Sequence, residues 1–188
     1  MREYIIAISA YRGTDIWDFV DGTVVKIYRP IDNQRLCYLG HKKKYCLKFQ
    51  AIIIPNGLIS SLCGPIMGRH GDWYIFQTTD VEEEIFDLWR REGVEQDGRL
   101  FLYSDPAYYS SDTVIRAYKR PRGGALSPNK ALVNPILSAS CIAVKYSFRI
   151  VQRTFKKSNF SDTPRINSFL IAVYYSTVVL LINVQMCL

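Results

Sequence analysis

The chain has 188 residues, of which 48% are hydrophobic and 22% are charged. This length suits one globular domain, and the composition excludes a chain that is disordered throughout. The net charge of +7 is unevenly spread, because residues 1–112 carry 13 Lys and Arg against 16 Asp and Glu, whereas residues 113–188 carry 11 against one. A basic second half favours a polyanionic partner such as nucleic acid or an anionic membrane surface, although a solvated helix face has the same composition.

Strand signals dominate the first half of the chain. After a short helix expected at residues 2–11, the segment 18–27 is rich in β-branched residues and alternates in part, which predicts a strand. Residues 28–48 are polar and basic, and we expect them to form a loop with irregular extended structure.

A hairpin is the clearest local prediction. The apolar runs 49–54 and 58–63 are rich in β-forming residues and flank the sequence Pro55-Asn56-Gly57. Asn and Gly both tolerate positive φ, so this pair between two such runs is typical of a hairpin turn.

The next elements alternate between helix and strand. Residues 79–93 predict a helix, because Thr79 and Glu82 have the spacing of a capping box. Short strands are expected at 99–105 and 113–118. Early strands followed by alternating elements predict a mixed α/β domain.

The last third of the chain predicts two helices. A Pro/Gly loop at 120–128 precedes a long helix over 129–157, and an apolar helix begins near Arg165. We expect one face of the long helix to be apolar, with Ile136, Cys141, Val144, Phe148 and Val151 on it.

The final apolar stretch allows two interpretations. Residues 166–188 contain no charged side chain and are long enough to span a bilayer. Polar residues such as Ser168, Tyr174 and Asn183 interrupt the stretch, which favours a helix buried in the domain core over a tail anchor.

Two carboxylates stand out by position. Asp21 lies within the first expected strand, and Asp105 lies at the end of a later one. An acid in an apolar strand is costly to bury unless it is paired or binds a metal, and functional groups of α/β sheets gather at the carboxyl ends of strands. Two such acids brought together would favour a divalent cation such as Mg²⁺, whereas the alternative is a turn or capping role for each Asp.

Several collinear motifs carry a resemblance to a known family. FVDGT is followed by a polar stretch and then by YLGHKKKYCLKFQAIIIPNGLISSLCGPIMGRHGDWYIF, with LYSDPAYY, VNPILSASCIAVKYSFRIVQRTF and VYYSTVVLLINVQMCL further along. These segments resemble the catalytic domain of Harbinger-type DDE transposases, especially fungal members, from about Phe19 to Leu188. The resemblance implies one DDE endonuclease-like domain over 1–188 with an RNase H-like mixed sheet flanked by helices, and no DNA-reading domain before it.

The resemblance also implies a metal-dependent site. In this family two aspartates and a glutamate hold Mg²⁺ or Mn²⁺ ions that assist attack on phosphorus. By the matching motifs, Asp21 is the first acid and Asp105 the second, while Asp72 is a further candidate ligand. The chain has Gly71 where the family has a histidine, with His70 beside it.

The third acidic position departs from the family. Lys145 stands where the glutamate is expected, and no Asp or Glu occurs between Asp112 and Asp162. Two acids and a lysine bring a charge of −1 to the metals instead of −3, and one unit-charge contact is worth about 4 kcal/mol at 4 Å in a dielectric of about 20. We therefore expect impaired or absent two-metal catalysis.

Basic residues predict contact with DNA. Lys42, Lys43, Lys44 and Lys48 fall, with Arg35, where the family approaches the DNA backbone, and Arg149 and Arg153 extend the basic surface along the long helix. Such contacts would be salt-sensitive and without sequence specificity, and a solvated loop is the alternative.

The function predicted from the sequence is a transposase-derived, metal-binding nuclease domain that is nuclear, acts on DNA and depends on a separate DNA-reading protein for targeting. The competing hypotheses are a non-catalytic DNA- or protein-binding remnant and a degenerate reading frame attached to membranes.

Overall fold

One mixed sheet forms the centre of the protein, whose computed structural model describes residues 15–154 and 168–188. The helix expected at 2–11 and the end of the long helix at 155–157 lie outside these residues. The strands follow the order β2-β3-β1-β5-β6, and β4 pairs with β3. Their bounds are β1 Ile16–Lys26, β2 Tyr38–Leu39, β3 Lys44–Ile53, β4 Ile59–Met67, β5 Phe101–Ser104 and β6 Val114–Arg116.

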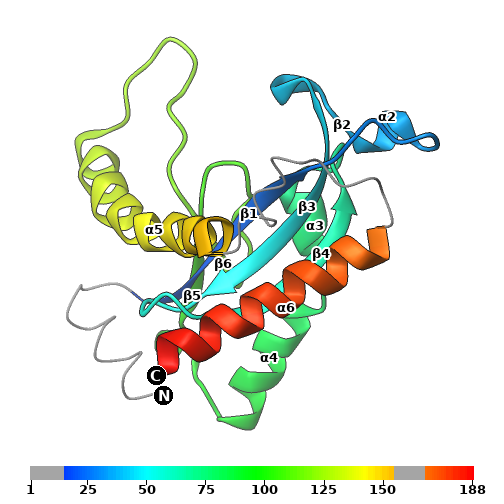
Figure 1. Cartoon of the computed structure of the whole chain (residues 1–188). Helices are drawn as coiled ribbons and strands as arrows, with labels where there is room; N and C mark the ends of the chain where they lie inside the picture. The colour runs from blue at the N-terminus through cyan, green and yellow to red at the C-terminus, as the bar shows by residue number, and fades with distance from the viewer. Residues whose placement is uncertain (1–14, 155–167) are drawn as a thin grey trace.

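Helices cover both faces of the sheet (Figure 1). The long helices α5 and α6 pack on one face, and the shorter α3 and α4 pack on the other. The structure therefore confirms a mixed α/β fold flanked by helices. The helix bounds are α2 Gln34–Cys37, α3 Asp72–Gln77, α4 Val81–Arg91, α5 Pro128–Thr154 and α6 Ser168–Cys187, with 3₁₀ turns η1 Gly40–Lys42 and η2 Gln96–Gly98.

The sheet combines antiparallel and parallel pairing. Strand β3 runs antiparallel to β1, β2 and β4, whereas β1, β5 and β6 run parallel to one another. The predicted strands at 18–27, 99–105 and 113–118 are confirmed as β1, β5 and β6. The loop expected over 28–48 is wrong in part, because α2, β2 and the start of β3 lie within it.

The predicted hairpin is confirmed as β3 and β4, but its turn is built differently. Gly57 alone takes a positive φ, of 92°, while the Asn56 side chain accepts a hydrogen bond from the Leu58 backbone N–H at 3.0 Å. The two C-terminal helices hold this hairpin in place. Ser147 of α5 donates to the Gly57 carbonyl at 2.9 Å, and Asn183 of α6 exchanges two hydrogen bonds with the backbone of Ile59.

The capping box expected at 79–82 is wrong. The Thr79 hydroxyl donates to the Phe76 carbonyl at the end of α3, and Glu82 accepts hydrogen bonds from the hydroxyls of Ser111 and Thr113. The helix expected there is nevertheless confirmed as α4. Glu82 therefore connects α4 to the loop before β6 and does not cap its own helix.

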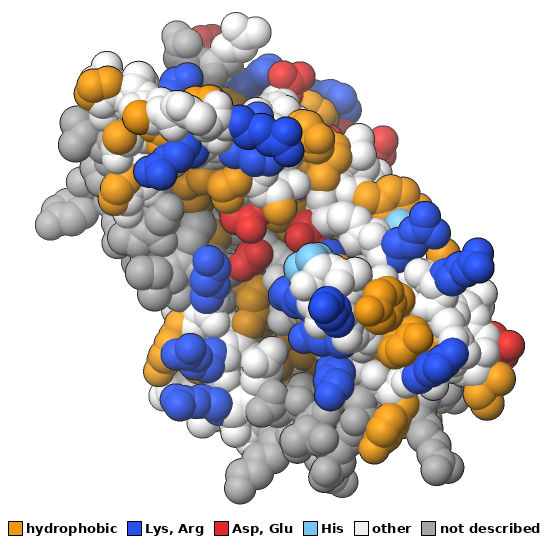
Figure 2. All heavy atoms as spheres, turned by 90° about the horizontal axis from the view of Figure 1, so that it is seen from above, with side chains coloured by type: hydrophobic (Ala, Val, Ile, Leu, Met, Phe, Trp, Pro, Cys, Tyr) orange, Lys and Arg blue, Asp and Glu red, His pale blue; other side chains and the backbone are white. Residues whose placement is uncertain are grey.

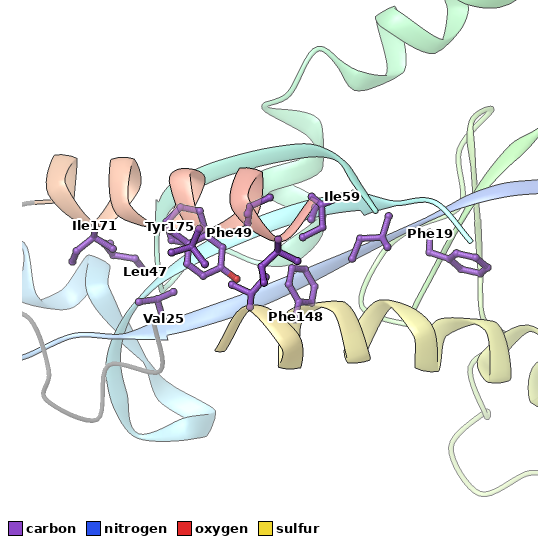
Figure 3. Close-up of a cluster of buried hydrophobic side chains, with 14 of the residues drawn as sticks. Phe19, Val25, Leu47, Phe49, Ile59, Phe148, Ile171 and Tyr175 are labelled. Atoms are coloured by element: carbon purple, nitrogen blue, oxygen red, sulfur yellow. The ribbon is translucent and has the colours of Figure 1, made fainter. Parts of the chain in front are cut away.

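The larger core lies between the sheet and α5 and α6 (Figure 3). Phe49 of β3 and Tyr175 of α6 stack at the centre of this core, with ring centroids 4.4 Å apart. Phe148 and Val151 of α5 are buried as predicted, while the side chains of Ile136, Cys141 and Val144 lie outside what the structure describes.

Helix α6 presents two different faces. Ile171, Tyr175, Val178, Val179 and Ile182 are buried against the sheet. On the other side Leu170, Leu180 and Val184 are more than half exposed. The segment Leu170–Cys187 is long and apolar enough to cross a membrane, yet one of its faces forms part of the domain core.

A buried acid in β1 predicts a pH-dependent stability. Asp18 is 1% exposed, and its Oδ1 has no hydrogen-bond partner among the residues described. Burial raises the pKa of Asp18 from 3.8 to about 8. Because the folded state then binds the proton more tightly than the unfolded chain, its stabilising contribution is complete below pH 3.8 and is lost as the pH rises through about 8.

The variant Asp18→Asn should remove this loss. An amide has nearly the same shape and needs no proton, so at pH 8.5 we expect the variant to be more stable by roughly 2 kcal/mol or more in urea unfolding. Asp32→Asn, at an exposed loop position, is the matched control and should leave the pH profile unchanged. Parallel pH profiles for Asp18→Asn and the unaltered chain would contradict the prediction.

Candidate active site

The register of two parallel strands brings Asp21 and Asp105 to one end of the sheet. The last residue pair between β1 and β5 is Val20 with Ser104; Asp21 is the next residue of β1, and Asp105 directly follows the end of β5. Strand β1 continues to Lys26, so its edge is no longer covered by β5 beyond this point. Both carboxylates therefore lie where β5 ends and the edge of β1 becomes accessible.

Asp21 is the more strongly perturbed of the two acids. The pKa of Asp21 is raised to about 6, chiefly by burial, and the nearby charges of Asp105 and Asp72 contribute to this increase. A hydrogen bond from the Gly22 N–H to Asp21 Oδ1, 2.7 Å long, and the positive charge of Lys145 act in the opposite direction. The charges of Asp105, Asp72 and Lys145 are therefore close enough to shift the pKa of Asp21.

Asp105 is held by the turn that follows β5. Its Oδ1 accepts a hydrogen bond from the Ala107 N–H at 2.8 Å, so the Asp-Pro sequence forms the turn expected of it. One carboxylate oxygen is used in this way, and the side chain stays partly accessible. Asp105 can therefore form this turn and also take part in the site.

Asp72 reaches the same site from the first turn of α3. Its Oδ1 accepts a hydrogen bond from Lys48 Nζ at 2.9 Å, in an ion pair whose side chains are 28% and 7% exposed. The carboxylate also lies against Gly22, where an added Cβ would come within 2.9 Å of Asp72 Oδ1. Glycine at this position therefore allows α3 to approach β1 closely.

Lys145 enters the site from α5. The helix is fixed beside it by Phe148, which is 6% exposed, and by the buried hydrogen bond of Ser147. Lys145 itself is exposed and faces the carboxylates closely enough to lower the pKa of Asp21.

These residues line one open pocket of about 510 Å³. Figure 2 shows acidic side chains together in a hollow at the centre of this face, with Lys, Arg and His side chains around them. The lining residues are Asp21, Gly22, Val24, Leu39, His41, Lys42, Lys48, Asp72, Asp105, Ala107, Lys145 and Phe148. Strands, a helix N-terminus and the long helix α5 thus bring three acids and three lysines to one cavity.

The sequence matches a family model, described as DDE superfamily endonuclease, over residues 20–181. The chain belongs to this family. The matched region contains every residue that lines the pocket. No curated protein and no solved structure gave a match.

Among the residues that the structure describes, this DDE domain presents no complete set of metal ligands. DDE superfamily endonucleases normally use divalent metals. Within residues 15–154 and 168–188, however, no group of three or more His, Cys, Asp or Glu side chains is arranged to hold a metal ion. Asp21 and Asp105 offer two carboxylates, and one oxygen of Asp72, Oδ1, is engaged by Lys48.

The predicted basic residues fall into separate groups in the DDE domain. Lys42 and Lys43 are exposed in and after η1, and Lys42 also lines the pocket. Arg149 and Arg153 are exposed along α5. The structure differs from the sequence prediction at Lys48, which is buried and paired with Asp72 and so is not part of the exposed basic surface; Lys44 is half-buried at the start of β3.

Sequence reasoning missed a polar network that supports the site. The Gln50 amide donates to the Asp72 carbonyl oxygen at 3.1 Å and to the Tyr108 hydroxyl at 2.7 Å. It therefore links the start of α3 to the chain just beyond Asp105. The available signal was the placement of Lys48 and Gln50 two residues apart in an otherwise apolar strand, which puts both on one face.

Proposed function

We propose that this DDE domain derives from a Harbinger-type transposase and has lost full DNA cleavage because Lys145 occupies the position of the third acid. The observation that carries the proposal is the shared pocket, in which Asp21, Asp105 and Lys145 meet although they are far apart in sequence. Their meeting supports the alignment of these three residues with the family's acidic motifs. The mixed sheet, with antiparallel β1, β3 and β4 followed by parallel β5 and β6, supports an RNase H-like fold.

Two carboxylates fit one divalent ion. Mg²⁺ is commonly held by one or two carboxylates together with water and substrate phosphates, and the raised pKa of Asp21 would be relieved by a cation nearby. Such an ion would lower the pKa of a bound water and offset charge on a phosphate oxygen. In this proposal Asp21 and Asp105 hold the ion, and Asp72, whose Oδ1 is bonded to Lys48, would contribute through its second carboxylate oxygen.

Lys145 opposes a second ion. Lys145 lines the same pocket and lowers the pKa of Asp21, so its positive charge acts on the carboxylates that a second metal would need. A lysine offers no lone pair to a metal while it is protonated. The site is therefore suited to a single, weakly held ion and to phosphate binding.

Plasmid nicking tests the proposed loss of cleavage. Purified full-length chain with Mn²⁺ and supercoiled DNA is expected to leave the plasmid intact over hours. Robust nicking that is abolished by both EDTA and Asp21→Asn would show an active enzyme and overturn the proposal.

DNA is the substrate that the family membership favours, and nuclear localisation follows for a eukaryotic protein that acts on genomic DNA. A non-catalytic DNA-binding role is the second candidate function, and the lysine among the carboxylates favours it. In both cases the exposed basic residues would contact phosphates, and a separate DNA-reading protein would supply sequence specificity.

The salt dependence of duplex binding tests the phosphate contacts. Replacing Lys42 and Lys43 together by Ala should weaken binding and reduce the slope of log K against log salt by about 1 to 2, since each lost phosphate contact contributes about 0.9. Arg91→Ala, at an exposed position on α4 across the sheet, is the control. Duplex affinity that stays constant from low to high salt would rule out contacts of this kind.

A further inference from the structure

An aromatic and basic surface begins at the rim of the pocket. Trp73 directly follows Asp72 in α3, and Tyr109 lies two residues beyond Ala107, so both are within two residues in sequence of a residue that lines the cavity. The two rings meet edge to face, with centroids 5.7 Å apart. The guanidinium of Arg116 lies over the Tyr109 ring at 5.5 Å. Tyr109 is still 60% exposed, so part of this residue is open to a ligand.

A second exposed ring, that of Tyr118, lies beside α5. Tyr118 is 42% exposed and has the Lys130 ammonium over its ring at 5.0 Å. Its backbone N–H and carbonyl are both bonded to the Asn134 side chain, at 2.9 and 2.8 Å. Asn134 and Lys130 are one helical turn apart on α5. Tyr118 lies in the loop after β6, and these contacts anchor it to α5.

The segment around these rings is strongly basic. Arg116, Lys119, Arg120 and Arg122 lie within seven residues that contain no acid. Lys119, Arg120 and Arg122 are exposed, whereas Arg116 is partly buried. Figure 2 shows basic and hydrophobic side chains alternating around the acidic hollow. Exposed rings interleaved with cations combine the two chemistries that bind an unpaired nucleic-acid strand, base stacking and phosphate contact.

We propose that Tyr109 and Tyr118 form a stacking platform that holds an unpaired DNA strand beside the pocket, with Lys119, Arg120 and Arg122 contacting its phosphates. In a duplex the base faces are stacked on one another, so tyrosine faces are useful for a strand whose bases are already separated. The inference rests on the proposed function for its choice of DNA, and it deepens that function by naming the form of DNA that the domain receives. A strand lying on this surface would enter the cavity over Ala107 and Asp72.

Anisotropy with a labelled oligothymidine tests the platform. The probe is about 16 nucleotides long, and the comparison is a duplex of equal length, both in EDTA with the full chain. We expect tighter binding of the single strand, and a 5- to 100-fold loss of its affinity in Tyr109→Ala and in Tyr118→Ala. Tyr109→Phe keeps the ring face and should bind like the unaltered chain.

Tyr28→Ala is the matched control, because Tyr28 is 52% exposed in the loop after β1. Only exposed side chains are changed, so each variant is expected to fold. The unfolding curve of each variant checks that its fold is intact. Unaltered single-strand affinity in both alanine variants would overturn the proposal, and so would equal affinity for duplex and single strand. The assay contains no metal and no nicking step, so its outcome is independent of whether Asp21 and Asp105 hold an ion.

Discussion

Replacing Lys145 by glutamate is expected to raise the affinity of the pocket for Mn²⁺ by about 10- to 100-fold, and to produce slow nicking of plasmid DNA where the unaltered chain shows none. The change turns a charge of −1, from Asp21, Asp105 and Lys145, into −3. An ideal contact would contribute about 4 kcal/mol, but Lys145 is exposed, and solvent screening reduces this to roughly 1.4–2.8 kcal/mol. Isothermal titration with Mn²⁺ measures the first effect, and gel analysis of supercoiled plasmid measures the second.

A carboxylate added elsewhere on α5 distinguishes metal binding by a glutamate at position 145 from a general effect of added negative charge. Tyr146→Glu places an acid one position further along the helix, outside the residues that line the pocket, and should leave Mn²⁺ affinity nearly unchanged. Combining Lys145→Glu with Asp21→Asn should remove most of the gain, because two carboxylates then remain instead of three. If Lys145→Glu binds Mn²⁺ no better than the native chain, the third position of the motif has been misassigned.

The position of the two aspartates could be predicted because it depends on local signals. Asp21 lies in a β-branched run and Asp105 ends a short apolar one, and strands of these types in an α/β domain tend to present their ends together. The register between β1 and β5 then brings the two residues level. The hairpin was equally accessible, since Asn56-Gly57 carries its own turn chemistry.

The supporting interactions could not be predicted because they join segments that sequence patterns treat separately. Lys48 and Asp72 are 24 residues apart, and their pairing depends on the close approach of α3 to Gly22. Helix α3 has six residues, too few to establish a helical period. Lysines near the start of β3 have the composition of a solvated loop, and only the fold shows that Lys48 points inward.

Helix α6 offers the most direct test of the core, because its sequence alone also fits a membrane span. Ile182→Ala removes a side chain that is 1% exposed between α6 and the sheet. We expect it to lower the free energy of unfolding by about 2–5 kcal/mol, from lost apolar burial and the cavity left behind. Urea unfolding of the full chain, followed by tryptophan fluorescence, measures this change.

Leu180→Ala is the matched control on the opposite side of the same helix. Leu180 is an aliphatic residue of the same size and is 65% exposed, so its replacement should change stability by no more than about 0.5 kcal/mol. A large loss of stability at residue 182 with little at residue 180 requires that α6 packs on the sheet by one face. The stacking of Tyr175 on Phe49 belongs to this face. Equal losses at both positions would mean that the outer face is also covered in solution. Small changes at both would mean that the apolar packing of α6 contributes little to the stability of the folded domain.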